Sequence, residues 1–163
     1  MDPQFNFLQE KCREIVTKNM KIFHPISDIK VITPSLAGEH MASACYHATV
    51  EFEKHESVQF FIKVKLKDGK TKEFVDQMEA FPTEGKFLTE FLSEMKTFCQ
   101  TKTDKIQHEL VQQLSSIFPE TYYVDDDTII MENAIPKGYE CLDKLKKQDF
   151  QFARYVKGLI HQN

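Results

Sequence analysis

VQFFIKVKL, residues 58–66, is the stretch that decides the fold. Its residues alternate between two sets, and a period of two is typical of a half-buried β-strand. One set is wholly apolar and consists of Val58, Phe60, Ile62, Val64 and Leu66. The other set places two lysines beside an aromatic ring and consists of Phe61, Lys63 and Lys65. The default interpretation is a surface sheet on which the lysines are solvated.

Two further strands are expected before this one. In ACYHATVEFE, residues 44–53, the side chains again alternate, and the polar residues 54–57 would turn the chain back to form an antiparallel pair. The Asp68-Gly69 dipeptide has the chemistry of a turn and would end the second strand of the pair. A shorter strand is expected in DIKVITP, residues 28–34.

A second hairpin and several helices are expected elsewhere in the chain. TYYV and TIIME, residues 121–124 and 128–132, flank an acidic turn. Helical spacing of apolar residues runs from Asp2 to about residue 22, and again over residues 83–99, 104–117 and 149–163. In the second of these helices, one stripe is expected to pack on the sheet, namely Phe87, Leu88, Phe91, Leu92, Met95 and Phe98.

These elements predict an α+β fold, with a small twisted antiparallel sheet of about five strands flanked by helices. The 163 residues correspond to a single domain with its own core. Within it we expect an N-terminal helix in residues 1–27, the sheet and its helices in residues 28–135, and a hinge with the start of a C-terminal helix in residues 136–163. The core should be rich in phenylalanine, since the chain has 14 Phe and no Trp.

Composition argues against several classes of function. The net charge of −4 gives no general attraction to nucleic acid, although a basic strip exists at Lys63, Lys65, Lys67, Lys70 and Lys72. The four cysteines are widely spaced and form no zinc motif, and no histidine accompanies them in the order of a cysteine hydrolase. The acidic run at residues 125–127 is expected to face water, so no metal site is predicted. Without a signal peptide or a long apolar run, an intracellular location in cytoplasm or nucleus is expected, with no membrane partner.

Four stretches in order carry a family resemblance. They are LAGEHMASACYHATVEFE (36–53), FFIKVKL (60–66), FPTEGKFLTEFLSEM (81–95) and FPETYYVDDDTIIMENAIPKGYE (118–140). Together they resemble the N-terminal lobe of the ecdysteroid-kinase-like family, a branch of the choline and aminoglycoside kinase group with a protein-kinase-like fold. The resemblance covers about residues 30 to 161.

The resemblance implies a nucleotide site. Gly38 would open the phosphate loop, Lys63 would hold phosphates and Glu84 would pair with Lys63. Glu132 and Asn133 would form the hinge that receives adenine, and ATP with magnesium would be the ligand if this site survives; no other cofactor is expected. Two alternatives stay open. Lys63 could be a solvated strand lysine, and Glu84 could be a carboxylate in the first turn of a helix, where the helix dipole favours it. Phe61 stands where adenine would need space, and only one glycine remains in the loop.

The resemblance also implies that catalysis needs residues outside this lobe. In that family, the aspartate base and the magnesium ligands follow the helix with which this chain ends. We therefore expect no catalytic residue and no enzyme activity, but a non-catalytic protein-interaction module. A protein partner or a second copy would bind the vacated lobe interface at Phe61, Tyr139, Tyr155 and Leu159. The alternative is the ATP-binding half of a kinase that phosphorylates a hydroxyl group of a small molecule such as a steroid.

Overall fold

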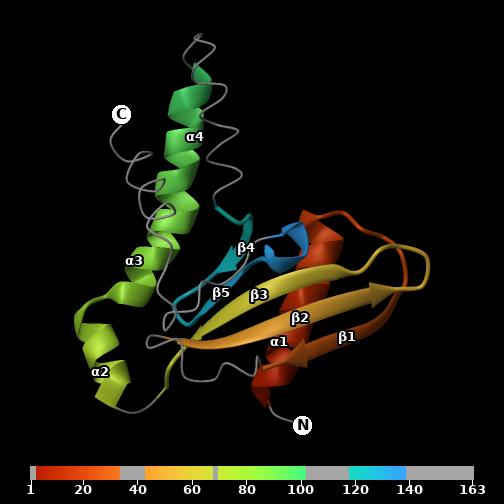
Figure 1. Ribbon diagram of the computed structural model, residues 1–163, viewed down its shortest axis with the longest axis horizontal. Helices are drawn as coiled ribbons and strands as arrows, with labels where there is room; N and C mark the ends of the chain where they lie inside the picture. Colours follow the sequence, from red (N-terminus) through yellow and green to blue (C-terminus); the bar gives the residue numbers. More distant parts are fainter. Residues whose placement is uncertain (1–2, 34–42, 68–69, 102–117, 139–163) are drawn as a thin grey trace.

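The chain folds around a five-stranded antiparallel sheet. A computed structural model describes residues 3–33, 43–67, 70–101 and 118–138 (Figure 1). The strands are β1 (Ile26–Ile32), β2 (Ser43–Phe52), β3 (Val58–Lys65), β4 (Thr121–Val124) and β5 (Thr128–Glu132), and their spatial order is β1-β2-β3-β5-β4. The predicted α+β class and the antiparallel five-stranded sheet are confirmed.

The alternation within β3 decides what each face of the sheet carries. Phe60, Ile62 and Val64 of its apolar set are buried. Phe61, Lys63 and Lys65, on the other face, are only partly exposed. On this second face the antiparallel register places Cys45 of β2 opposite Lys63 and His47 opposite Phe61. From the other side, β5 places Ile129 opposite Lys63 and Met131 opposite Phe61. Lys63 therefore lies in the centre of the sheet.

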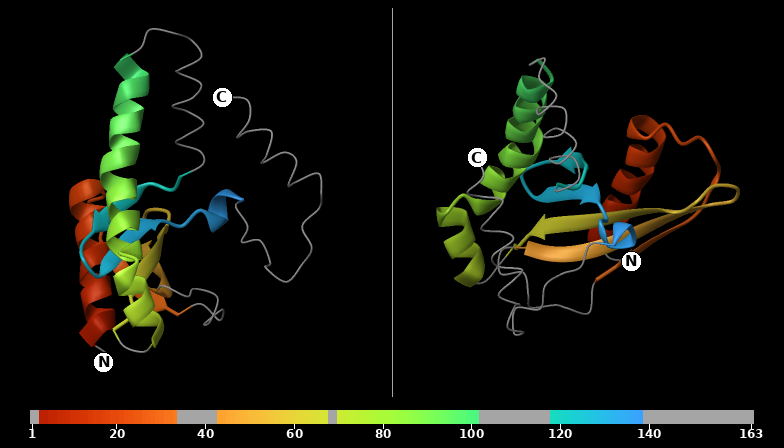
Figure 2. Two further views of the ribbon diagram at one scale, coloured as in Figure 1. Left: turned by 90° about the vertical axis from the view of Figure 1, so that its left-hand side faces the viewer. Right: turned by 45° about the horizontal axis from the view of Figure 1, so that its top comes forward.

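An N-terminal helix covers the first face of the sheet. The helix α1 (Pro3–Glu14) begins at a proline, where its missing N–H is no loss, and continues as the π-helical turn η1 (Ile15–Asn19). Figure 2 shows how α1 lies along the sheet. Its apolar stripe is buried and forms the main core with the inner residues of β2 and β3; the stripe consists of Leu8, Cys12, Ile15 and Val16. The predicted helix is confirmed, and it ends three residues earlier than expected.

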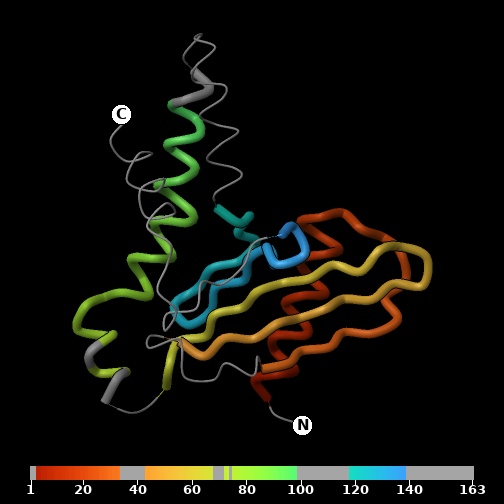
Figure 3. The backbone as a smooth tube through the Cα atoms, in the orientation of Figure 1, coloured from red at the N-terminus to blue at the C-terminus, as the bar shows by residue number. Residues whose placement is uncertain are grey.

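A series of consecutive helical segments lies on the side of the second face. It comprises α2 (Lys70–Gln77), α3 (Ala80–Lys86), the π-helical turn η2 (Phe87–Phe91) and α4 (Leu92–Thr101). The tube in Figure 3 shows how α4 extends away from the sheet, while α3 lies close to it. A smaller core joins α3 to β5 through Phe81, Ile129 and Met131, with Phe61, Leu88 and Val124 packed against it. A short 3-10 helix, η3 (Ile135–Lys137), follows β5.

The prediction of an apolar stripe on the helix expected over residues 83–99 is wrong in part. Leu92 is buried and Leu88 packs on the smaller core, but Phe91 and Phe98 are 51% and 60% exposed. The π-helical turn explains the difference, because its wider turn inserts one residue and shifts the faces of the helix. The residues of these helices that face the sheet are therefore Phe81, Gly85 and Leu88.

Several expectations fall outside the described residues. These are the phosphate-loop glycine Gly38, the helices expected over 104–117 and 149–163, and three of the four interface residues, Tyr139, Tyr155 and Leu159. The division of the chain into a single domain stays a prediction. In the described part of the chain, no helix combines the length and the apolar character that crossing a membrane requires.

Candidate functional site

The second face of the sheet brings together the two charged residues that were expected to pair. Lys63 Nζ of β3 lies 2.5 Å from Glu84 Oε1 of α3. The side chains are 23% and 37% exposed, so the pair is partly withdrawn from water and keeps access to a ligand. A charge-assisted contact of this kind fixes the ammonium group in one position, because each partner restricts the other.

The local sequence of α3 explains how Glu84 reaches the strand. Phe81 is buried on the β5 side chains, and Gly85, one turn later on the same face, is buried too. A Cβ at Gly85 would lie 2.9 Å from Val124 Cγ1 of β4, closer than atoms normally approach. Only glycine allows α3 to come this near to the sheet, and this approach carries Glu84 to Lys63.

A second ion cluster lies beside the first and was not predicted. Lys65 Nζ contacts Asp76 Oδ1 of α2 at 2.8 Å, and Lys72 of the same helix contacts the other oxygen. Hydrogen bonding to Lys65 and then to Lys72 lowers the pKa of Asp76, and Asp76 raises the pKa of Lys65. The sequence signal that was missed is the four-residue spacing of Lys72 and Asp76, which favours an ion pair on a helix.

The segment after β5 is held by a set of backbone and side-chain bonds. Asn133 is 8% exposed, and its Nδ2 donates to Gln59 Oε1 at 3.1 Å. Its Oδ1 accepts from the N–H of Ile135 at 3.2 Å. Glu132 Oε1 lies 2.6 Å from Lys137 Nζ. The two predicted hinge residues thus use their side chains to fix this segment. Their backbone N–H groups are bonded within the chain as well, Glu132 to the Glu120 carbonyl at 2.8 Å and Asn133 to the Gln59 carbonyl at 3.2 Å.

Phe61, predicted both as an obstacle to adenine and as an interface residue, is half-buried. It packs against the smaller core, and the edge of the His47 ring meets it at a centroid distance of 5.4 Å. Burial lowers the pKa of His47, so this imidazole is neutral near pH 7. Phe61 is therefore a partly buried aromatic side chain on the second face, next to Lys63.

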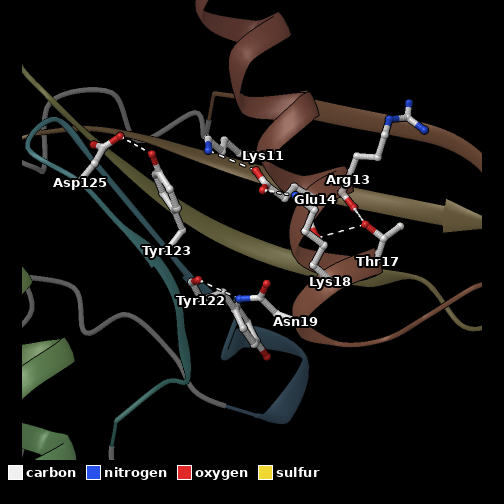
Figure 4. A network of polar contacts seen from close by, with 9 residues as sticks. All are labelled: Lys11, Arg13, Glu14, Thr17, Lys18, Asn19, Tyr122, Tyr123 and Asp125. Carbon is white, nitrogen blue, oxygen red and sulfur yellow. Dashed lines mark hydrogen bonds and ion pairs between the residues drawn. The ribbon is translucent and has the colours of Figure 1, made fainter.

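The acidic turn between β4 and β5 has a structural explanation. Asp125 Oδ1 accepts hydrogen bonds from the N–H groups of Asp127 and Thr128 at 2.9 and 2.6 Å, and its Oδ2 accepts one from the Tyr123 hydroxyl at 2.6 Å. Figure 4 shows the hydrogen bond between Asp125 and Tyr123. The turn also contacts α1, because Lys11 Nζ lies 4.4 Å from the centre of the Tyr123 ring. Among the described residues, no group of three or more metal-ligating side chains occurs.

One of three comparisons with known proteins found a match, to a family. Residues 37–158 match the model of a family described as the ecdysteroid kinase-like family. No curated protein and no solved structure matches the chain. The matched range includes β2 to β5, the helices of the second face and the pair formed by Lys63 and Glu84.

Proposed function

Because the chain belongs to the ecdysteroid kinase-like family, we propose that it binds the phosphates of ATP as the nucleotide-binding lobe of a small-molecule kinase. The observation that supports this proposal is the contact between Lys63 and Glu84 on the second face of a kinase-like sheet. In kinases a strand lysine that contacts the phosphates is held in place by a helix glutamate. A lysine that only needed to be solvated would gain little from such a partner.

Each residue has a separate role in this proposal. Lys63 Nζ donates to a phosphate oxygen, and Glu84 keeps Lys63 directed along the face of the sheet. Gly38 opens the phosphate loop, and the backbone from Glu132 to Ala134 receives the adenine ring. Phe61 and His47 form the apolar floor beside the base. The acceptor is a hydroxyl group of an ecdysteroid-like small molecule, and this assignment rests on the family name alone.

Calorimetric titration with magnesium-ATP tests the proposal. The wild-type chain should bind the nucleotide, and K63M should weaken binding at least tenfold because it removes a charge that contacts phosphate. E84Q should weaken binding less, since Lys63 keeps its charge. K30M is the matched control, because Lys30 is also a strand lysine with a carboxylate 2.8 Å away, but it lies on the edge strand β1. The absence of binding at millimolar nucleotide, or equal losses in K63M and K30M, would contradict it.

A non-catalytic protein-interaction module is the second candidate function. The observation in its favour is the exposure of Phe91 and Phe98 on one helix, 51% and 60%. The two residues are seven positions apart, about two helical turns, and an exposed apolar patch on a helix can mark an interface. If the partner is a second copy, sedimentation should show self-association that rises with concentration and is lost in the F91S/F98S double variant. A wild-type chain that stays monomeric at every concentration would contradict self-association.

A further inference from the structure

Two histidines from distant parts of the sequence lie side by side at one end of the sheet. His24 precedes β1 and His55 lies in the turn between β2 and β3; their ring centroids are 5.3 Å apart and their planes differ by 36°. The neighbouring backbone holds them together, because the N–H of Glu53 donates to the carbonyl of Pro25 at 3.1 Å. Both imidazoles are exposed to solvent.

The ring of His55 is already fixed in the form that a metal ligand needs. Its Nδ1 lies 2.7 Å from the carbonyl oxygen of Glu56, and since a carbonyl can only accept, Nδ1 carries the proton. Nε2 of the neutral ring is then the nitrogen with the free lone pair. The Phe52 and His55 rings make an edge-type contact, with centroids 5.4 Å apart and planes at 71°. A hydrogen bond from the second ring nitrogen to a carbonyl is the usual support of a metal-bound histidine.

We propose that His24 and His55 together bind one divalent transition-metal ion of the class of Zn²⁺, Ni²⁺ and Cu²⁺. Two imidazoles bound at ~2.0 Å with a tetrahedral angle between them have centroids roughly 5 Å apart. The observed separation of 5.3 Å therefore needs no movement of the backbone. Because His24 is exposed, rotation about its last side-chain bond turns a ring nitrogen toward the ion.

The rest of the coordination shell follows from the surroundings. No group of three or more ligating side chains occurs in the part of the chain that the structure describes, so the proposal uses these two imidazoles as its protein ligands. The ion is therefore exchangeable, unlike a structural zinc with four protein ligands. It links the segment before β1 to the turn that joins β2 and β3, and it stabilises the folded chain because the unfolded chain does not hold the two rings together. This site is independent of Lys63 and of the proposed nucleotide.

Calorimetry and thermal unfolding of the untagged chain with each metal chloride test the site. One ion should bind per chain and raise Tm by several degrees, with Cu²⁺ the tightest, as expected for nitrogen ligands. Magnesium should give no shift, because it prefers oxygen ligands.

Substitution of single histidines identifies the ligands. H24Q and H55Q should each weaken binding at least tenfold, and both should fold because the side chains are exposed. K54Q is the matched control, since Lys54 is exposed in the same turn as His55, and it should bind the ion as the wild type does. Absence of binding to the wild type, or undiminished binding in both H24Q and H55Q, would overturn the proposal.

Discussion

Val124 of β4 occupies the space that a side chain at Gly85 would need, with Cγ1 2.9 Å from the position of a Cβ. G85A should therefore lower the free energy of unfolding by about 1 kcal/mol. The overpacking costs roughly 1–3 kcal/mol and exceeds the ~1 kcal/mol that alanine gains over glycine inside a helix. Urea unfolding measures the change. The matched experiment repeats G85A in a V124A background, where the cost should shrink; an equal cost in both backgrounds would show that Val124 is not the obstacle.

The ion pair between Lys63 and Glu84 should couple the two residues only modestly in the absence of ligand. Their exposures of 23% and 37% mean that solvent screens the attraction, so we expect a coupling energy of about 0.5–1 kcal/mol. A double-mutant cycle of K63M, E84Q and the combined variant measures this energy by chemical unfolding. Strictly additive effects would show that the pair does not contribute to stability.

The helix α1 should contribute a large share of the stability. Leu8 is 0% exposed in the main core, so L8A should lower the free energy of unfolding by about 2–4 kcal/mol through lost burial and a residual cavity. F7A removes a larger side chain from the preceding position. Because Phe7 is 40% exposed, this substitution should lower the free energy of unfolding by less than about 1 kcal/mol. Urea unfolding of both variants is the measurement. Similar costs for the two would mean that α1 is not part of the cooperative core.

Asp76 should make stability depend on acid pH. Hydrogen bonds to Lys65 and Lys72 lower its pKa in the folded chain below the ordinary value of 3.8. The folded state therefore binds its proton less readily than the unfolded state, and the contribution of Asp76 is complete above pH 3.8 and is lost as pH falls through the folded pKa.

D76N should consequently be less stable than wild type at pH 7, and the difference should narrow below about pH 4. Thermal unfolding across pH measures both curves. E73Q is the control on the same helix, because Glu73 is exposed and forms no ion pair among the described residues. A difference between D76N and wild type that stays constant down to pH 2 would exclude this role of Asp76.

The sheet could be predicted from the sequence because its signals are local. The alternation in β2 and β3 and the turn residues between β4 and β5 need only neighbouring residues to be recognised. The buried face of β3 followed directly from its period of two. The partnership of Lys63 with Glu84 came from the family resemblance, because no spacing rule connects a strand lysine to a helix residue so far along the chain.

The missed features all depend on contacts between distant segments. The helix α2 was not predicted, because only two of its eight residues, Phe74 and Val75, are apolar and they form no helical stripe. Position 85 favours glycine because of the nearby side chain of Val124. Val124 lies on β4, which β5 separates from β3. No sequence pattern predicts the π-helical turn that exposes Phe91, so the apolar stripe was predicted with the spacing of an ordinary α-helix.

The strand order has a consequence for the chain as it leaves the ribosome. The helix α1 and strands β1, β2 and β3 are contiguous in the sequence and can assemble first, whereas β5 adds to β3 through the pairing of Lys63 with Ile129. Until β5 has been synthesised, Phe61 and Phe81 lack the side chains of Ile129 and Met131 that cover them. A nascent chain stalled before β5 therefore presents an unpaired strand edge beside exposed aromatic rings, which is the kind of surface that chaperones bind.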